Sequence, residues 1–123
     1  MQLSPYLYPG LQDTPDLTER TEKEHIDYVV RTCSDYSGIP IKDLLFKRCQ
    51  NSIVDRPIVN MKKLICYYLR TRGVPIKAVE RCYPDNKGFN HATVSHNYDE
   101  VRGFLHIKDP EFTKFVNDLN DIL

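Results

Sequence analysis

The sequence has no long apolar run, and its opening stretch, MQLSPYLYPG, has neither the basic start nor the apolar segment of a secretory signal. A membrane-spanning helix needs about 20 predominantly apolar residues. We therefore expect no membrane span and a cytoplasmic protein. The formal net charge is zero, which argues against indiscriminate binding to nucleic acid.

Motifs for metal binding and catalysis are also missing. The four cysteines form no CxxC pair, and no histidine stands at zinc-finger spacing from them. Cys33 and Cys66 fall within apolar helical patterns, so reduced and mostly buried thiols are expected, with a zinc site of distant ligands as the less favoured alternative. No nucleophile motif or framed carboxylate pair is present. We expect no enzyme, no catalytic residues, no metal and no cofactor.

What the sequence does contain is helical periodicity. Hydrophobic residues make up 41% of the 123 residues, enough for the modest core of one domain. Apolar spacing predicts an all-α fold of about six helices over residues 18–123, with no strand. Residues 1–17, rich in proline and turn formers, are expected to form an extended arm whose Tyr6, Leu7 and Tyr8 can dock on a surface.

Capping signals suggest where the helices begin and end. The box Thr21-Glu22-Lys23-Glu24 predicts the first start, and Gly38 and Gly73 predict two ends. The other expected starts are Pro40, Ser52 or Asp55 with Pro57 in the first turn, Pro75, Asn90, and Asp109-Pro110.

Charge is unevenly distributed along the chain. Residues 42–81 carry 10 basic and 3 acidic side chains, whereas residues 1–41 carry 3 and 7, and residues 82–123 carry 4 and 7. A basic centre between acidic flanks can present one positive face to nucleic acid. A solvated helical surface explains the same pattern equally well.

The stretch GFNHATVSHN, residues 88–97, suggests base recognition. A helix that begins at Asn90, after a long helix, a short one and a loop, has the layout of a helix-turn-helix. Asn90 can pair with adenine, His91 can donate to guanine, and Ala92 and Thr93 can touch a thymine methyl group. The alternative is that Asn90 is an ordinary helix cap and that Thr93 bonds only within its own helix.

The order of motifs resembles the C-terminal DNA-binding domain of DnaA, the bacterial replication initiator, over roughly residues 18–123. The resemblance is carried by IKDLL at 41–45, Lys47-Arg48, Arg56-Pro57, residues 61–69, residues 74–79, and NHATVSH at 90–96. It implies a DnaA C-terminal or Trp-repressor-like helix-turn-helix that binds double-stranded DNA in replication initiation or its regulation.

The resemblance also implies roles for matched residues. Lys47 and Arg48 match a loop that contacts the minor groove, and Pro75 and Lys77 match a segment that approaches phosphates. Asn90, His91, Ala92 and Thr93 match the base-reading helix end. Further phosphate contacts are expected from Arg56, Lys62 and Lys87.

The chain departs from the family pattern at several positions. Phe89-Asn90 stands where the family has Arg-Asp, Val59-Asn60 stands for Arg-Gln, and the loop before the signature is about three residues longer. No GxxxxGK[ST] phosphate loop is present, so we expect a free-standing relative of one domain, monomeric by default. These departures keep an alternative open: a protein-interaction module that lost specific DNA binding and captures replication proteins through its arm.

Overall fold

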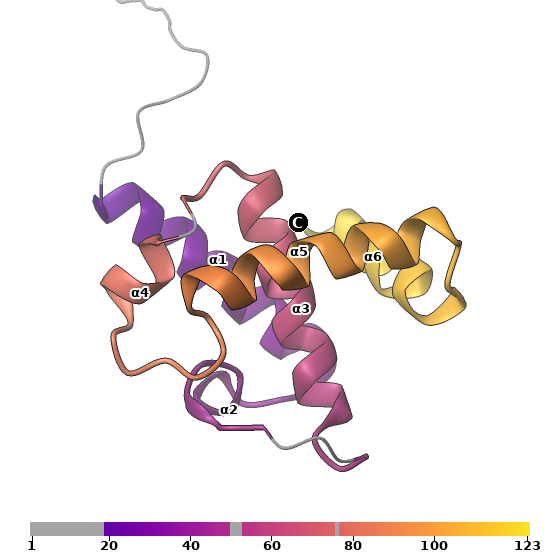
Figure 1. The fold of residues 1–123 in the computed structure, drawn as a ribbon, viewed down its shortest axis with the longest axis horizontal. Helices are drawn as coiled ribbons and strands as arrows, with labels where there is room; N and C mark the ends of the chain where they lie inside the picture. The colour runs from indigo at the N-terminus through magenta and orange to yellow at the C-terminus, as the bar shows by residue number, and fades with distance from the viewer. Residues whose placement is uncertain (1–18, 50–52, 76) are drawn as a thin grey trace, which may run out of the picture.

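The computed structural model describes residues 19–49, 53–75 and 77–123, and this part of the chain is all-α (Figure 1). The described residues form six helices and no strand, as the periodicity predicted. The expected arm, residues 1–17, lies outside them, as do Ser52 and Ile76. The helices are α1 Glu19–Ser37, α2 Ile41–Phe46, α3 Arg56–Thr71, α4 Ala78–Cys82, α5 His91–His106 and α6 Pro110–Ile122.

The long helix α3 is the centre of the molecule. It packs between α1 and α5, while α2 joins α1 to α3, α4 packs against α1, and α6 closes against α5 and α1 (Figure 1). Because α3 has neighbours on two sides, it buries polar residues as well as an apolar stripe. Its buried residues are Ile58, Asn60, Met61, Lys62, Leu64, Ile65, Cys66, Tyr68 and Leu69.

Several predicted helix ends are confirmed. The Asn90 side chain accepts a hydrogen bond of 2.9 Å from the Thr93 N–H, and that of Asp109 accepts one of 3.0 Å from the Phe112 N–H. Pro57 lies in the first turn of α3, and Gly73, with φ 79°, follows its end. That positive φ suits glycine, which has no Cβ to clash with the backbone.

The predicted capping box at Thr21 is wrong, because α1 already begins at Glu19 and Thr21 lies inside the helix. Glu22 has another role. It is buried and forms an ion pair with Arg81 of α4. Beside this pair, the Tyr83 hydroxyl donates to Asp27 of α1. Both contacts hold α4 and the segment after it against α1.

Cys33 and Cys66 are buried as predicted, Cys49 and Cys82 are half-buried, and all four are free thiols. Within the described ranges, no group of three or more His, Cys, Asp or Glu side chains could hold a metal ion. Among the same residues, no helix is long and apolar enough to cross a membrane.

Candidate nucleic-acid interface

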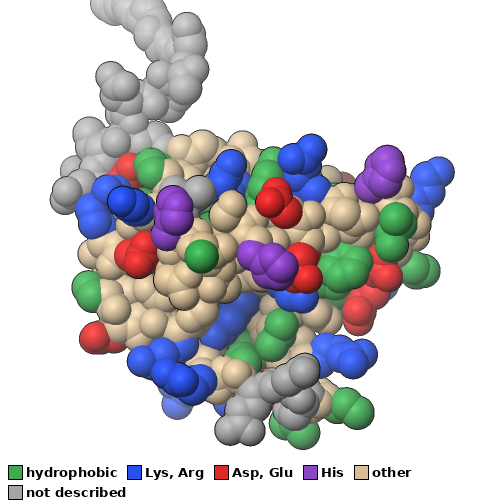
Figure 2. All heavy atoms as spheres, viewed as in Figure 1, with side chains coloured by type: hydrophobic (Ala, Val, Ile, Leu, Met, Phe, Trp, Pro, Cys, Tyr) green, Lys and Arg blue, Asp and Glu red, His purple; other side chains and the backbone are tan. Residues whose placement is uncertain are grey.

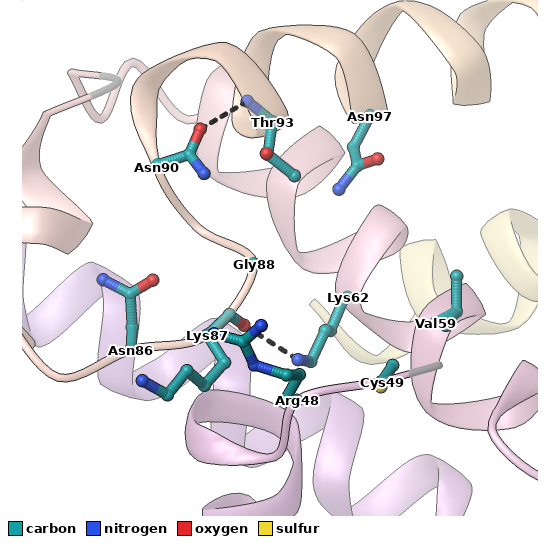
Figure 3. A pocket seen from close by; sticks show the side chains of 10 residues that line it. All are labelled: Arg48, Cys49, Val59, Lys62, Asn86, Lys87, Gly88, Asn90, Thr93 and Asn97. Carbon is teal, nitrogen blue, oxygen red and sulfur yellow. Dashed lines mark hydrogen bonds between the residues drawn. The ribbon is translucent and has the colours of Figure 1, made fainter. Parts of the chain in front are cut away.

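A groove of about 470 Å³ opens between four parts of the chain: the α2–α3 connection, the first half of α3, the α4–α5 connection and the start of α5 (Figure 3). We call it the basic groove. Its lining residues are Arg48, Cys49, Val59, Lys62, Asn86, Lys87, Gly88, Asn90, Thr93 and Asn97. Three of them are basic and none is acidic, so the described lining has a positive potential that attracts anions.

The α4–α5 connection, from Tyr83 to Asn90, is held in place by its own hydrogen bonds. Asn86 accepts from the Phe89 N–H at 2.9 Å and donates to the Tyr83 carbonyl at 2.7 Å. The Lys87 N–H donates to the Leu45 carbonyl of α2 at 2.8 Å, and Phe89 is fully buried. These contacts fix the backbone that carries Lys87, whose side chain is exposed at the edge of the groove.

Lys62 joins the two connections across the groove. Its ammonium donates to the carbonyl oxygens of Lys47 at 2.7 Å and of Lys87 at 2.8 Å, and lies 5.8 Å from the centre of the Phe89 ring. The residue is only 6% exposed, and this burial lowers the pKa of its ammonium. Lys62 therefore holds the α2–α3 and α4–α5 connections together. Its ammonium is occupied by these two carbonyls and does not extend to the surface, where the expected phosphate contact would be made.

Gly88 suits the backbone of this connection. Its φ of +91° lies in the left-handed region, which glycine adopts without strain. A Cβ at this position would be in ordinary van der Waals contact with the Lys62 Nζ at 3.5 Å, so it is the φ and not the space that favours glycine.

The start of α5 contributes polar side chains and a helix N-terminus, at which the Asn90 side chain caps the Thr93 N–H. Asn90, Thr93 and Asn97 follow one face at helical spacing and line the groove, while His91 and Ala92 are exposed beside it. The first turn contains no acidic residue. The first N–H groups of a helix have no partner within the helix, and their partial positive charge favours an anion.

The basic residues of the α2–α3 connection are not equivalent. Lys47 Nζ lies 3.4 Å from a carboxylate oxygen of the buried Asp55, so its charge is partly compensated. Arg48 is exposed, and its guanidinium extends into the groove beside Lys87 (Figure 3). Arg48 and Lys87 are thus the basic side chains best placed to meet a ligand there.

The remaining predicted site residues lie elsewhere. Arg56, at the start of α3, lines a different groove. Pro75 and Lys77 are exposed before α4 and are not part of the described lining. Of the residues proposed from the sequence, the basic groove therefore brings together Arg48, Lys62, Lys87, Asn90 and Thr93.

Sequence reasoning missed half of the lining: Cys49, Val59, Asn86, Gly88 and Asn97. Asn97 could have been found, because it stands four residues after Thr93 and seven after Asn90, on the same helical face. It is a buried polar residue, and its amide donates to the Cys66 sulfur at 3.6 Å. Cys49, Asn86 and Gly88 depend on how the two connections fold, and Val59 depends on which side of α3 they cover.

The surface agrees with the close-up view. Lys and Arg side chains gather at the lower left of Figure 2, over the α2 region. Comparisons of the chain with protein-family models, with curated proteins and with solved structures found no match.

Proposed function

We propose that this protein binds double-stranded DNA through the basic groove and the start of α5, in replication initiation or its regulation. One observation carries the proposal: Arg48 and Lys87 flank a groove whose described lining holds no carboxylate and which ends at the N-terminus of a 16-residue helix. The order of motifs that resembles the DnaA C-terminal domain supports the choice of duplex DNA as the anion.

In this proposal, phosphates and bases are contacted by different parts of the site. Arg48 and Lys87 neutralise phosphates of the backbone, which positions the protein without selecting a sequence. The exposed His91 and Ala92, with Thr93 behind them, approach base edges in the major groove. Asn90 can join them because its amide oxygen has two lone pairs and the helix cap uses one.

We interpret α4 and α5 as an expanded helix-turn-helix. The usual turn has three or four residues, whereas here the connection runs from Tyr83 to Asn90. The extra length lets the connection carry Lys87 to the groove while α4 packs against α1. α5 then takes the place of the recognition helix, with its N-terminal residues toward the DNA.

The proposal is tested by the salt dependence of binding to a mixed-sequence duplex. Each phosphate contact contributes about 0.9 to the slope of log K against log salt. The double variant Arg48→Gln/Lys87→Gln should lower that slope by about 1.8. The matched control Arg56→Gln/Lys108→Gln removes the same charge from exposed positions outside the basic groove. An equal change in both variants would mean that the protein's overall charge drives binding, not this groove.

A protein-interaction module is the second candidate. It is favoured by an apolar groove on the other side of α3, lined by Ile53, Met61 and Phe115 among others. Under this alternative the polar start of α5 serves only as a helix cap. Duplex binding would then be weak, would show no sequence preference, and would vanish at about 0.15 M salt, where non-specific attraction is suppressed.

A further inference from the structure

A second groove, of about 610 Å³, is formed by the end of α1, the start of α3 and α6. It lies on the opposite side of α3 from the basic groove: Pro57, Asn60 and Met61 line one, Val59 and Lys62 the other. Its apolar lining consists of Tyr36, Ile39, Ile53, Pro57, Met61 and Phe115. We call it the apolar groove.

Two observations indicate that this groove lacks an occupant. Ile53 is 82% exposed at its margin, and the adjacent Val54 is 81% exposed. Asn60 also lines the groove, and its side-chain amide, which makes no hydrogen bond to any described residue, is open to the groove and is not enclosed in the core. A carboxamide, with one acceptor and two donor hydrogens, matches the C=O and N–H groups of an extended peptide.

The sequence offers a segment that fits. Residues 5–9, PYLYP, contain two tyrosines and a leucine between two prolines and carry no charge. Proline fixes its own φ and biases the preceding residue toward extended backbone, so such a segment loses little entropy when it docks. Extended proline-flanked segments are bound by grooves with aromatic linings, here Tyr36 and Phe115 with ring centres 6.2 Å apart.

The charges around the groove agree with an uncharged ligand. Two basic residues, Arg56 and Lys114, and two acidic ones, Glu111 and Asp118, belong to the lining. Lys114 and Asp118 form an ion pair of 2.7 Å. The groove therefore offers no net charge that would select an acidic or basic peptide.

We propose that the apolar groove binds residues 5–9 of a second copy of the chain. The chain's own segment would have to reach from the start of α1 to its end, about 28 Å for 19 residues. Residues 10–18 span at most about 32 Å when fully extended. Docking within one chain would need a nearly taut tether, whereas a second copy can place its groove nearer the start of the first copy's α1, and mutual exchange gives a symmetric dimer.

Sedimentation equilibrium of the full chain over a wide concentration range tests the exchange. Wild type should show a dimer whose fraction rises with concentration. Tyr6→Ser/Tyr8→Ser and, separately, Ile53→Glu should weaken dimerisation at least about tenfold, because each removes apolar anchors. The controls Leu11→Ser, elsewhere in the arm, and Ile107→Glu, an exposed residue after α5, should dimerise like wild type. A monomeric wild type, or unchanged dimerisation in the tyrosine variant, would overturn the proposal.

A peptide titration then identifies the groove itself. A synthetic peptide of residues 3–11 is added to the full-length Tyr6→Ser/Tyr8→Ser protein, and amide signals are followed by NMR. We expect the side-chain amide of Asn60 to shift, and Ile53→Glu to weaken peptide binding about tenfold. Shifts confined to other parts of the protein would overturn the groove assignment. Peptide binding at the groove by a protein that stays monomeric as wild type would overturn the second copy as occupant.

Discussion

Replacing Lys62 by methionine tests how the basic groove is built. The substitution keeps a long, unbranched side chain on α3 but removes the ammonium that bridges the carbonyls of Lys47 and Lys87. No other described lysine makes two hydrogen bonds of this kind across the groove. The α2–α3 and α4–α5 connections should therefore lose their direct tie while the core around α3 stays filled.

The size of the effect follows from opposing contributions. A hydrogen bond to a charged group contributes about 1.5–3 kcal/mol to stability, so two of them contribute about 3–6 kcal/mol. Against this stands the cost of burying the ammonium, which also lowers the pKa of Lys62 and amounts to several kcal/mol for an ion. Water can reach both carbonyls at the open groove. We expect Lys62→Met to lower the free energy of unfolding by about 1–3 kcal/mol.

Urea unfolding, followed by circular dichroism, measures that loss. Lys63→Met is the matched control, because the neighbouring Lys63 makes a partly exposed ion pair of 2.9 Å with Glu100, worth at most about 1 kcal/mol. Amide hydrogen exchange at Lys87, whose N–H bonds to Leu45, should speed up in Lys62→Met alone. Equal stability of the two variants, with unchanged exchange at Lys87, would refute the bracing role of Lys62.

Two further predictions concern the helix cap and a buried thiol. Asn90→Ala should cost about 1 kcal/mol of stability by removing the bond to the Thr93 N–H. Asn90→Asp keeps a cap but adds a carboxylate to the basic groove, so duplex titration should show weaker binding by this variant. Wild-type affinity of Asn90→Asp would contradict DNA binding in the basic groove. Burial raises the pKa of the Cys33 thiol to about 12 from 9.0. Between these two pH values the folded thiol stays protonated while the unfolded thiol ionises, which favours the unfolded state. The free energy of unfolding therefore keeps its full value below pH 9 and falls as the pH rises to 12. Between pH 8 and pH 10 the difference in unfolding free energy between wild type and Cys33→Ala should narrow by about 1 kcal/mol, and a difference independent of pH would contradict the burial of this thiol.

The helices could be predicted because their signals are local. Apolar spacing, the proline at position 57 and the side-chain caps at Asn90 and Asp109 each act within one or two turns of a helix. The failure at Thr21 shows the limit of such signals. A Ser/Thr-x-x-Glu pattern also occurs inside a helix, and here α1 already begins at Glu19, two residues before Thr21.

The site was harder to predict because it depends on how two connections meet. Lys62 reads as a surface lysine in the sequence, and only packing between the Lys47 and Lys87 backbones reveals it as a brace. Arg56 was grouped with the other basic residues by charge, yet its position on α3 directs it to the apolar groove. The sequence did group Asn90 and Thr93 at the start of one helix, and both line the basic groove.

Selection of bound sequences from a random duplex library, at about 0.15 M salt to suppress non-specific attraction, tests the central claim most directly. We predict that wild type enriches a defined motif and that His91→Ala weakens binding to it by about 1–3 kcal/mol, while weaker binding to unrelated duplexes is nearly unchanged. No enriched motif for wild type, or an equal loss on all sequences in His91→Ala, would contradict base reading by the start of α5.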